Sequence, residues 1–298
     1  MNLDHQIRVA AFDWLAKQVN RLGDDVLPRS LLAQGFPFQG TLIPLVSPKG
    51  IFKPRQLEYP LTITTTPEGP YEDSFAGNDL LLYKYRGTDL NHRDNAGLRQ
   101  AMQKHIPLIY FHGVVPGKYL AIWPVYIVGD DPESLTFTVA ADSQLEWESR
   151  EDMVREDDTA RRSYITSTVK TRLHQRGFRE RVIAAYQSQC SFCRLKHAEL
   201  LDAAHIIPDG EENSQPVVTN GLALCKIHHA AFDRSLIGVT PDYDIMVRRD
   251  VLEEEDGPML VHGLQDLHKQ KLLLPHSKQN WPDREFLYWR YQRFQQAG

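Results

Sequence analysis

The chain has few cysteines, no long apolar run and no internal repeat. Its 298 residues include only three cysteines, and it has no stretch of about 18 consecutive apolar residues, so no membrane-spanning helix is expected. Residues 1–23 mix charged and apolar side chains at helical spacing, and they lack the uninterrupted apolar stretch and small-residue cleavage site of a signal peptide. We therefore expect a cytoplasmic protein, in which disulfide bonds are disfavoured.

The chain also lacks a positive net charge, which by itself argues weakly against a nucleic-acid partner. The formal net charge is −5, but binding depends on the local distribution of charge rather than on its sum. Residues 146–158 are mostly acidic, whereas the following stretch contains one acid, Glu180, and seven basic residues: Arg161, Arg162, Lys170, Arg172, Arg176, Arg179 and Arg181. Such a run is typical of a solvated helix face, and it is also a candidate phosphate-contacting surface.

The organisation of the chain indicates two domains and an α+β fold. After an expected helix at about 5–22 and apart from an inserted helix at 94–104, the first half consists of short β-like runs at 40–46, 59–66, 79–85, 107–113, 119–128 and 135–141. We expect a β-rich domain at 1–145, with a curved sheet or barrel-like fold. A linker and basic helix should follow at 146–174, and a second domain at 175–298 should end in a helix at 282–296.

All three cysteines lie in one region, in two ligand pairs with the same spacing. Two residues separate Cys190 from Cys193, and two separate Cys225 from His228. The first pair alone is compatible with buried cysteines or with a redox pair. A second pair that ends in histidine and leaves no cysteine over favours one tetrahedral Zn²⁺. Because all four ligands come from the protein, we expect a closed, structural zinc site.

A second set of polar residues is interleaved with these pairs. His205 follows the segment Leu-Leu-Asp-Ala-Ala, Asn220 precedes Gly-Leu-Ala-Leu-Cys, and His229 directly follows His228. The order His205, Asn220, His229, combined with the two ligand pairs, resembles the HNH, or ββα-metal, nucleases. The resemblance implies a β-hairpin that carries His205 and Asn220, a following helix that carries His229, and a divalent cation, most often Mg²⁺, between hairpin and helix.

These residue types suit the hydrolysis of a phosphodiester bond. A neutral imidazole titrates near neutral pH, so we assign the general base that activates water to His205. The resemblance implies that Asn220 holds the hairpin and orients His205, and that His229 binds the catalytic cation. Because His228 and His229 are adjacent, their side chains point in different directions, so one can bind zinc while the other serves the active site.

One position departs from the family pattern. Many members have a metal-binding Asp or His directly before the first catalytic histidine, where this chain has Ala204. Asp202 lies on the same face of an ideal strand as residue 204. We predict Asp202 as the second ligand of the catalytic cation, with Asp233 as the rival. Asp202 is equally compatible with a solubilising charge at a strand edge.

Both halves of the chain resemble parts of restriction enzymes. Residues 161–244 are similar to bacterial restriction-type HNH endonucleases, and residues 262–274 are similar to their C-terminal tail. Residues 70–128 resemble the SRA-like modules of the PUA superfamily that accompany HNH domains in modification-dependent restriction enzymes. This second resemblance rests on GPYEDSFAGNDLLLYKYRGTD, DNAGLRQAM and PLIYFHGVVPGKYLAIWPVYIV. It implies that the first domain recognises a modified base.

A module that inspects a base must extrude it, stack it between aromatic faces and bind its edge with hydrogen bonds. The candidate residues for such a pocket are Tyr71, Asp73, Tyr85, Asp89 and Trp123. Aromatic residues that alternate along strands are usually core residues. Tyr71 and Asp73 are the stronger candidates, because they lie in a polar segment bounded by Gly and Pro, where loops carry function.

Together these features predict a restriction endonuclease that cuts double-stranded DNA containing 5-methyl- or 5-hydroxymethylcytosine, in defence against phage or foreign methylated DNA. Because one HNH site hydrolyses one strand, we expect a homodimer. Two alternatives remain open. One is an HNH endonuclease directed to an unmodified sequence or to phosphorothioate DNA. The other is a non-catalytic, zinc-stabilised DNA-binding protein, which Ala204 would favour.

Overall fold

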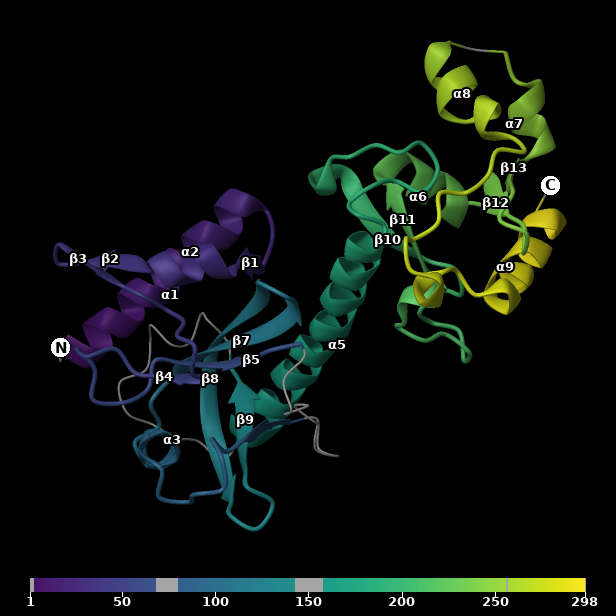
Figure 1. Ribbon diagram of the computed structural model, residues 1–298. Helices are drawn as coiled ribbons and strands as arrows, with labels where there is room; N and C mark the ends of the chain where they lie inside the picture. The colour runs from purple at the N-terminus through teal and green to yellow at the C-terminus, as the bar shows by residue number, and fades with distance from the viewer. Residues whose placement is uncertain (1–2, 68–79, 143–157, 256, 298) are drawn as a thin grey trace. The chain divides into compact units, whose positions relative to one another are not determined.

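The computed structural model describes residues 3–67, 80–142, 158–255 and 257–297 (Figure 1). The chain forms two compact units, Met1–Arg176 and Gly177–Gly298, each of which is described here by itself. Both units combine helices with antiparallel strands, so the expected α+β class is confirmed. No helix in the described ranges is long and apolar enough to cross a membrane.

The N-terminal unit is built on a seven-stranded sheet with the order β4-β5-β7-β8-β9-β6, in which β1 also pairs with β8. Neighbouring strands are antiparallel except β5 and β7, which are parallel. A separate hairpin consists of β2 and β3. The strands are β1 Val26–Pro28, β2 Phe36–Phe38, β3 Thr41–Ile43, β4 Ile51–Phe52, β5 Thr62–Thr65, β6 Leu81–Lys84, β7 Leu108–Val115, β8 Lys118–Asp131 and β9 Thr136–Ala141.

The two faces of this sheet are covered by different cores, because successive side chains of a strand point to opposite faces. Along β8, Tyr119 and Trp123 join a cluster with helix α1 (Leu3–Leu22) and helix α2 (Arg29–Gln34). Leu120 and Ile122 join the cluster on the other face. The apolar residues of α1 recur at helical spacing and bury one side of that helix, as the sequence predicts.

Two further helices belong partly or wholly to this unit. Helix α3 (Arg93–Gln103) confirms the helix expected at 94–104. Helix α5 (Asp158–Ala185) takes up most of the segment expected as a linker with a basic helix. Its first part packs on the N-terminal unit, since Val169 and Leu173 belong to the same core cluster as Leu120 and Ile122.

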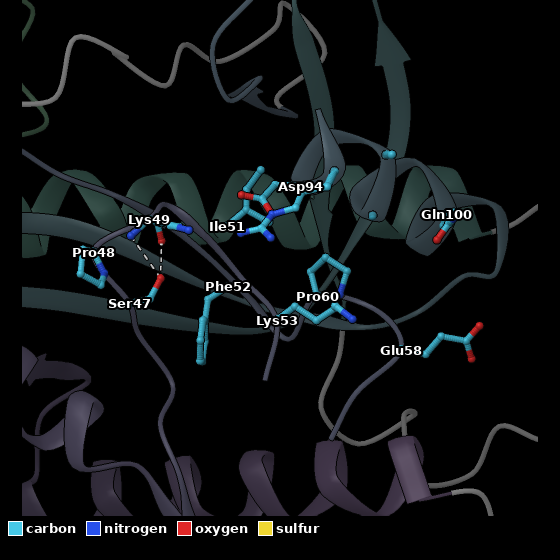
Figure 2. Close-up of a pocket in the computed structure, with 13 residues that line it drawn as sticks. Ser47, Pro48, Lys49, Ile51, Phe52, Lys53, Glu58, Pro60, Asp94 and Gln100 are labelled. Carbon is cyan, nitrogen blue, oxygen red and sulfur yellow. Dashed lines mark hydrogen bonds and ion pairs between the residues drawn. The ribbon is translucent and has the colours of Figure 1, made fainter. Parts of the chain in front are cut away.

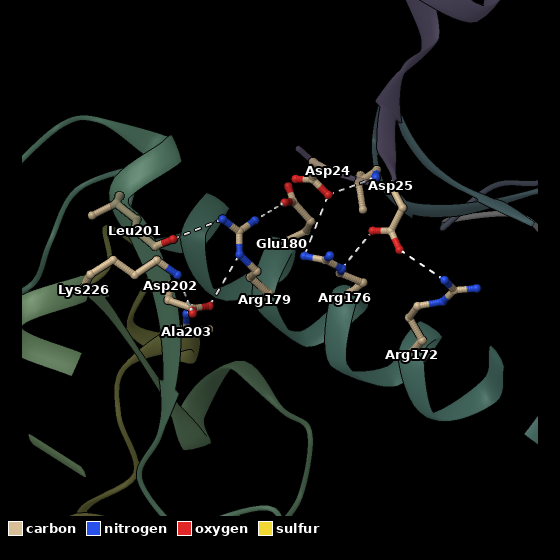
Figure 3. A network of polar contacts seen from close by, with 11 residues as sticks. Asp24, Asp25, Arg172, Arg176, Arg179, Glu180, Leu201, Asp202, Ala203 and Lys226 are labelled. Atoms are coloured by element: carbon tan, nitrogen blue, oxygen red, sulfur yellow. Dashed lines mark hydrogen bonds and ion pairs between the residues drawn. The ribbon is translucent and has the colours of Figure 1, made fainter. Parts of the chain in front are cut away.

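Several arginines of α5 form ion pairs with carboxylates of the same unit. Arg176 Nε lies 2.8 Å from Asp25 Oδ1, and Arg172 lies 3.7 Å from the other oxygen of Asp25 (Figure 3). Arg162 lies 3.0 Å from the buried Asp142. The basic run is therefore largely committed to pairs within the protein, which argues against its interpretation as a surface built to contact phosphates.

The C-terminal unit places a hairpin and a helix at its centre. Strand β10 (Leu201–His205) pairs with β11 (Gly221–Cys225), and helix α6 (Lys226–Asp233) begins directly after β11. The core combines these elements with the end of α5 and with a second hairpin. The other elements are β12 Ile237–Val239, β13 Ile245–Val247, α7 Arg249–Glu253, α8 Pro258–Gly263, α9 Arg284–Gln296 and the 3₁₀ turns η1 Ala198–Leu200, η2 Val218–Asn220, η3 Gln265–Leu267 and η4 Lys278–Asn280.

The terminal helix α9 agrees with the expectation for residues 282–296. Asp283 caps it, because Oδ1 of this residue accepts hydrogen bonds from the backbone N–H groups of Glu285 (2.7 Å) and Phe286 (3.2 Å). The helix packs on β12 so closely that a Cβ on Gly238 would lie 2.6 Å from the ring of Phe294. Helix α9 is thus an integral part of the C-terminal unit.

Candidate active site

The four expected zinc ligands come together in the C-terminal unit. The ligand atoms of Cys190, Cys193, Cys225 and His228 all lie within 4.8 Å of one another, and they form the one such group of three or more His, Cys, Asp or Glu residues in the described part of the chain. Nδ1 of His228 lies 3.5 Å from Sγ of Cys190 and 3.2 Å from Sγ of Cys225. Ligands of a tetrahedral Zn²⁺ are about 3.6 Å apart, so the donor set and its spacing fit this ion.

The local fold and a more distant carbonyl orient these ligands. Cys190 and Cys193 lie in a turn closed by the hydrogen bond from Arg194 N to Cys190 O (2.9 Å). Nε2 of His228 lies 2.7 Å from the carbonyl oxygen of Gly263 and donates to it when Nδ1 faces the sulfurs. Burial lowers the pKa of His228, but its contacts with the cysteine sulfurs and with Gly263 outweigh burial and raise the pKa to about 10. Zinc binding must therefore displace a proton from this ring.

The hairpin and helix form the ββα arrangement that the sequence predicts. His205 is the last residue of β10 and pairs in register with Gly221, the first residue of β11. A Cβ on Gly221 would lie 2.4 Å from Val182 and 2.9 Å from Phe178, both on α5. Only glycine permits this close approach, so this position fixes the hairpin against α5.

Asn220 is fully buried and connects the two ends of the loop between the hairpin strands. Its Oδ1 accepts a hydrogen bond from Ile207 N (2.9 Å), and its Nδ2 donates to the carbonyl oxygens of Ile207 (3.1 Å) and Gln215 (3.0 Å). These contacts are those of a structural brace for the loop. Through Ile207, Asn220 contacts the backbone two residues after His205.

His205 is half-buried and stacks on the ring of Phe178, with the ring centroids 3.9 Å apart and an interplanar angle of 11°. In the described ranges its ring makes no hydrogen bond. Burial lowers the pKa of His205, the charge of His229 lowers it further, and the charges of Asp209 and Asp233 oppose the shift. The imidazole is therefore neutral at physiological pH, and its nitrogens are available to a water molecule.

His229 lies between two carboxylates, one at each ring nitrogen. Nδ1 lies 3.7 Å from Asp202 Oδ2, and Nε2 lies 3.2 Å from Asp233 Oδ2, one helical turn further along α6. The carboxylates of Asp202 and Asp233 outweigh the effect of burial and raise the pKa of His229 to about 9. A cation that binds this ring must therefore displace a proton at neutral pH.

The two carboxylates have different surroundings. Asp202 also lies 3.0 Å from Lys226 Nζ and 3.4 Å from Arg179 Nε (Figure 3). Burial raises the pKa of Asp202, but His229 and Lys226 outweigh it and hold the pKa well below its usual range. Asp233 lies 3.6 Å from Arg290 on α9, and the charges of Asp233 and His205 act on each other.

The opposite ring nitrogens of His229 cannot both bind one cation. A cation at Nε2 could also bind the carboxylate of Asp233. It would lie on the side of His229 that faces Asp233, whose charge acts on His205. Two ligands of an octahedral Mg²⁺ are about 3.0 Å apart, close to the 3.2 Å between Nε2 and Asp233. Asp202 faces the other nitrogen and two basic side chains, which suits an orienting partner better than a ligand.

Some residues of this site carry little signal in the sequence. The spacing of His229 and Asp233, four residues apart on one helix, could have indicated that the two side chains are neighbours, but not which ring nitrogen Asp233 faces. Arg290 donates to the carbonyl oxygen of Phe232 (3.0 Å) and is 8% exposed, so α9 supports the end of α6. No local sequence pattern predicts this contact between α9 and α6.

Of the candidate base-binding residues, the three that the structure describes are not brought together. Tyr71 and Asp73 lie outside the described residues. Tyr85 is buried, stacks on Phe137 at 4.5 Å and contacts Asp130 and Arg99 through its hydroxyl group. Trp123 belongs to the core on the other face of the sheet.

Asp89, the remaining candidate, is exposed in a turn, where Oδ1 accepts a hydrogen bond from Asn91 N (2.9 Å). Tyr85, Asp89 and Trp123 therefore do not line a common pocket, because strand alternation and burial separate the two rings.

Comparison with known proteins agrees with the interpretation of the hairpin and helix. A family model described as HNH endonuclease matches residues 190–240, which include all four candidate zinc ligands, His205, Asn220 and His229. The chain thus contains an HNH endonuclease domain. No curated protein matches the chain in sequence.

A solved structure titled "Modification dependent TagI restriction endonuclease" is similar over 79% of this chain and 81% of its own, at 15% identity and a TM-score of 0.29. A similarity at this level does not establish a common fold, and the SRA-like character of the N-terminal unit is not shown by it.

Proposed function

We propose that the protein is an endonuclease that hydrolyses the phosphodiester bonds of double-stranded DNA, and that its N-terminal unit directs it to DNA containing modified cytosine. The observation that carries the first part is the ββα scaffold, with His205 at the end of β10 and the pair of His229 and Asp233 on α6, in a segment that matches an HNH endonuclease model.

The side chains divide the chemistry among them. His205 accepts a proton from the attacking water, because its pKa is lowered and its ring makes no competing hydrogen bond within the described residues. Nε2 of His229 and a carboxylate oxygen of Asp233 would hold a divalent cation such as Mg²⁺. When bound, this cation neutralises charge on the phosphate and on the leaving oxygen. Asp202 lies 3.7 Å from Nδ1 of His229 and would favour a proton on that nitrogen, which leaves the Nε2 lone pair for the cation.

The Cys190, Cys193, Cys225 and His228 cluster has a separate, structural role. It joins the turn after α5 to the end of β11 and the first turn of α6, which carries His229. Zn²⁺ at this cluster would fix the start of α6 relative to the hairpin. The geometry of the active site would then depend on zinc, although zinc takes no part in the reaction.

Residue Ala204 gives less support to a non-catalytic protein than the sequence alone indicates. Its side chain is fully buried in the core of the C-terminal unit. Residue 204 therefore does not face an open metal site that has lost a ligand. The carboxylate that the family pattern places at residue 204 has a candidate substitute in Asp233.

The preference for 5-methyl- or 5-hydroxymethylcytosine rests on the resemblance of residues 70–128 to SRA-like modules. Digestion of matched duplexes that contain cytosine, 5-methylcytosine, 5-hydroxymethylcytosine or glucosylated 5-hydroxymethylcytosine tests it directly, with His205→Ala as the inactive control. We expect the full chain to cut one of the modified substrates at least several-fold faster than the unmodified one. Equal cutting of all four would leave the endonuclease proposal intact and favour an enzyme directed to an unmodified sequence. Cutting of phosphorothioate DNA alone would favour backbone recognition.

A further inference from the structure

The N-terminal unit contains a cleft of about 700 Å³ between the segment that runs from Ser47 to Pro60 and the first turns of helix α3. Figure 2 shows Lys49, Phe52 and Lys53 along the first segment and Asp94 and Gln100 on the helix. Ligand sites commonly have volumes of about 300–1,000 Å³, so the cleft is large enough for one nucleotide. Tyr85, Asp89 and Trp123 are not among the described residues that line it.

Three basic side chains line this cleft. Lys49 and Lys53 have no carboxylate within ion-pair distance in the described part of the chain, and Lys53 Nζ donates to the carbonyl oxygen of Leu57 (3.1 Å). Arg93 is 74% exposed and lies 3.6 Å from Asp94. Asp94 already pairs with Arg86, and Glu58 is the other acid among the described lining residues. The described lining therefore has more basic than acidic side chains, in a chain whose net charge is −5.

Within the described residues, three arginines of helix α5 are already paired with carboxylates, unlike the two lysines of the cleft. There Arg162, Arg172 and Arg176 form ion pairs with Asp142 and Asp25. An anion that bound those arginines would have to compete with carboxylates that are already in place. An anion that entered the cleft would meet two lysines that have no such partner among the described residues.

The cleft also has apolar walls. Phe52 is half-buried, and Pro48 and Pro60 line the same space. Gly97 on α3 allows Pro60 to approach, since a Cβ there would lie 3.2 Å from its ring. Basic side chains combined with an aromatic ring and apolar walls are typical of sites that bind the backbone of a nucleic-acid strand and accommodate a base.

We propose that this cleft receives one nucleotide of the DNA substrate, with its phosphate near Lys49, Lys53 and Arg93 and its base against Phe52 and Pro60. The inference rests on the proposed DNA endonuclease function and adds the place where the N-terminal unit contacts a strand. A nucleotide that enters a cleft of this size must leave the base stack.

The test measures binding of a labelled duplex to the full chain in a His205→Ala background, which prevents cleavage. The test variant is Lys49→Ala with Lys53→Ala. The matched control is Lys17→Ala with Lys84→Ala, two exposed lysines of the same unit that do not line the cleft. Loss of two phosphate contacts should weaken binding roughly 10- to 30-fold at about 0.15 M salt and should reduce the slope of log K against log salt by about two. The control variant should match the parent protein.

Two further measurements separate the proposal from loss of folding and from simple backbone contact. Lys49→Arg with Lys53→Arg should retain most of the affinity, because the charges remain. A 2-aminopurine in the duplex should become more fluorescent on binding to the parent protein, and Phe52→Leu should reduce that increase. Equal affinity and salt slope in the test and control variants would overturn the proposal, as would binding without a 2-aminopurine signal at any position. A wild-type chain that cuts no DNA would instead refute the proposed function.

Discussion

Separate replacement of Asp233 and Asp202 should affect cation binding to different extents. Asp233 lies at Nε2 of His229 with the spacing of a shared cation, whereas Asp202 faces Nδ1 and also contacts Lys226. We expect Asp233→Ala to abolish Mg²⁺ or Mn²⁺ binding at millimolar cation. Asp202→Ala should weaken binding by roughly 10- to 100-fold, the usual effect of losing a partner that orients a ligand. Asp202→Asn should recover part of this loss, because its amide oxygen still presents partial negative charge to Nδ1–H.

The pH dependence of cation binding gives a second measure of the same geometry. The pKa of His229 is raised to about 9 in the absence of a cation, so the ring is mostly protonated at pH 7. A cation binds only the unprotonated ring. Its apparent affinity should therefore rise close to tenfold per pH unit up to about pH 9 and then level off. In Asp202→Ala the rise should end at a lower pH, because one of the two carboxylates that stabilise the protonated ring is gone.

Isothermal titration of the zinc-loaded protein with Mn²⁺, in buffers of different ionisation enthalpy, measures both affinity and proton release. Asp242→Ala is a suitable control, since Asp242 is 75% exposed and pairs with Arg284 rather than with His229. Near wild-type binding by Asp233→Ala, together with no binding by Asp202→Ala, would refute the assignment and restore Asp202 as the ligand. Binding with no proton release at pH 7 would contradict the raised pKa of His229.

Three other predictions concern the zinc cluster, the general base and assembly. Elemental analysis should find one zinc per chain, and Cys225→Ser should unfold the C-terminal unit, because metal binding and folding are coupled; well-folded protein without zinc would contradict this. The rate of cleavage at saturating cation should fall on acidification with an apparent pKa below the usual value of about 6.5 for histidine, since burial lowers the pKa of His205; a midpoint above that value would argue against His205 as the base. Light scattering should show a dimer, and double-strand cleavage by a monomer, first order in enzyme, would exclude it.

The grouping of Cys190, Cys193, Cys225 and His228 could be predicted from the sequence because it depends on short spacings. Cys190 and Cys193 share one turn, and Cys225 and His228 span the junction of β11 and α6. Tight local geometry leaves little freedom in where such side chains point. The same holds for adjacent His228 and His229, whose rings face cysteine sulfurs and carboxylates, respectively.

The choice between Asp202 and Asp233 could not be made from the sequence. It depends on which ring nitrogen of His229 each carboxylate faces, and this is set by the packing of α6 on the hairpin. Alternation along an ideal strand placed Asp202 near the position of the missing ligand. It gave no information on Lys226 and Arg179, which hold the carboxylate of Asp202 at Nδ1.

Less of the first half could be predicted, because its ion pairs and its strand register join residues that are far apart in the sequence. The run of arginines at 161–181 is conspicuous, but its partners Asp25 and Asp142 are far away in the sequence. Tyr85 and Trp123 both lie on or next to β-like runs, and only the register of the sheet shows that they belong to cores on opposite faces. The cleft lined by Lys49, Lys53 and Arg93 likewise joins segments with no shared motif.

The most direct test of the central claim is cleavage of modified and unmodified plasmid DNA by the purified full chain and by its His205→Ala variant. Each protein is assayed with Mg²⁺ and after treatment with a chelator. We expect the wild-type chain to nick or linearise at least one substrate in the presence of Mg²⁺, and cleavage should stop when the free cation is removed. His205→Ala should bind DNA with unchanged affinity and retain zinc, yet cut roughly 100- to 10,000-fold more slowly, since the general base that activates water is lost. Equal cleavage by the two proteins, or no cleavage of any substrate by the wild-type chain, would contradict the account.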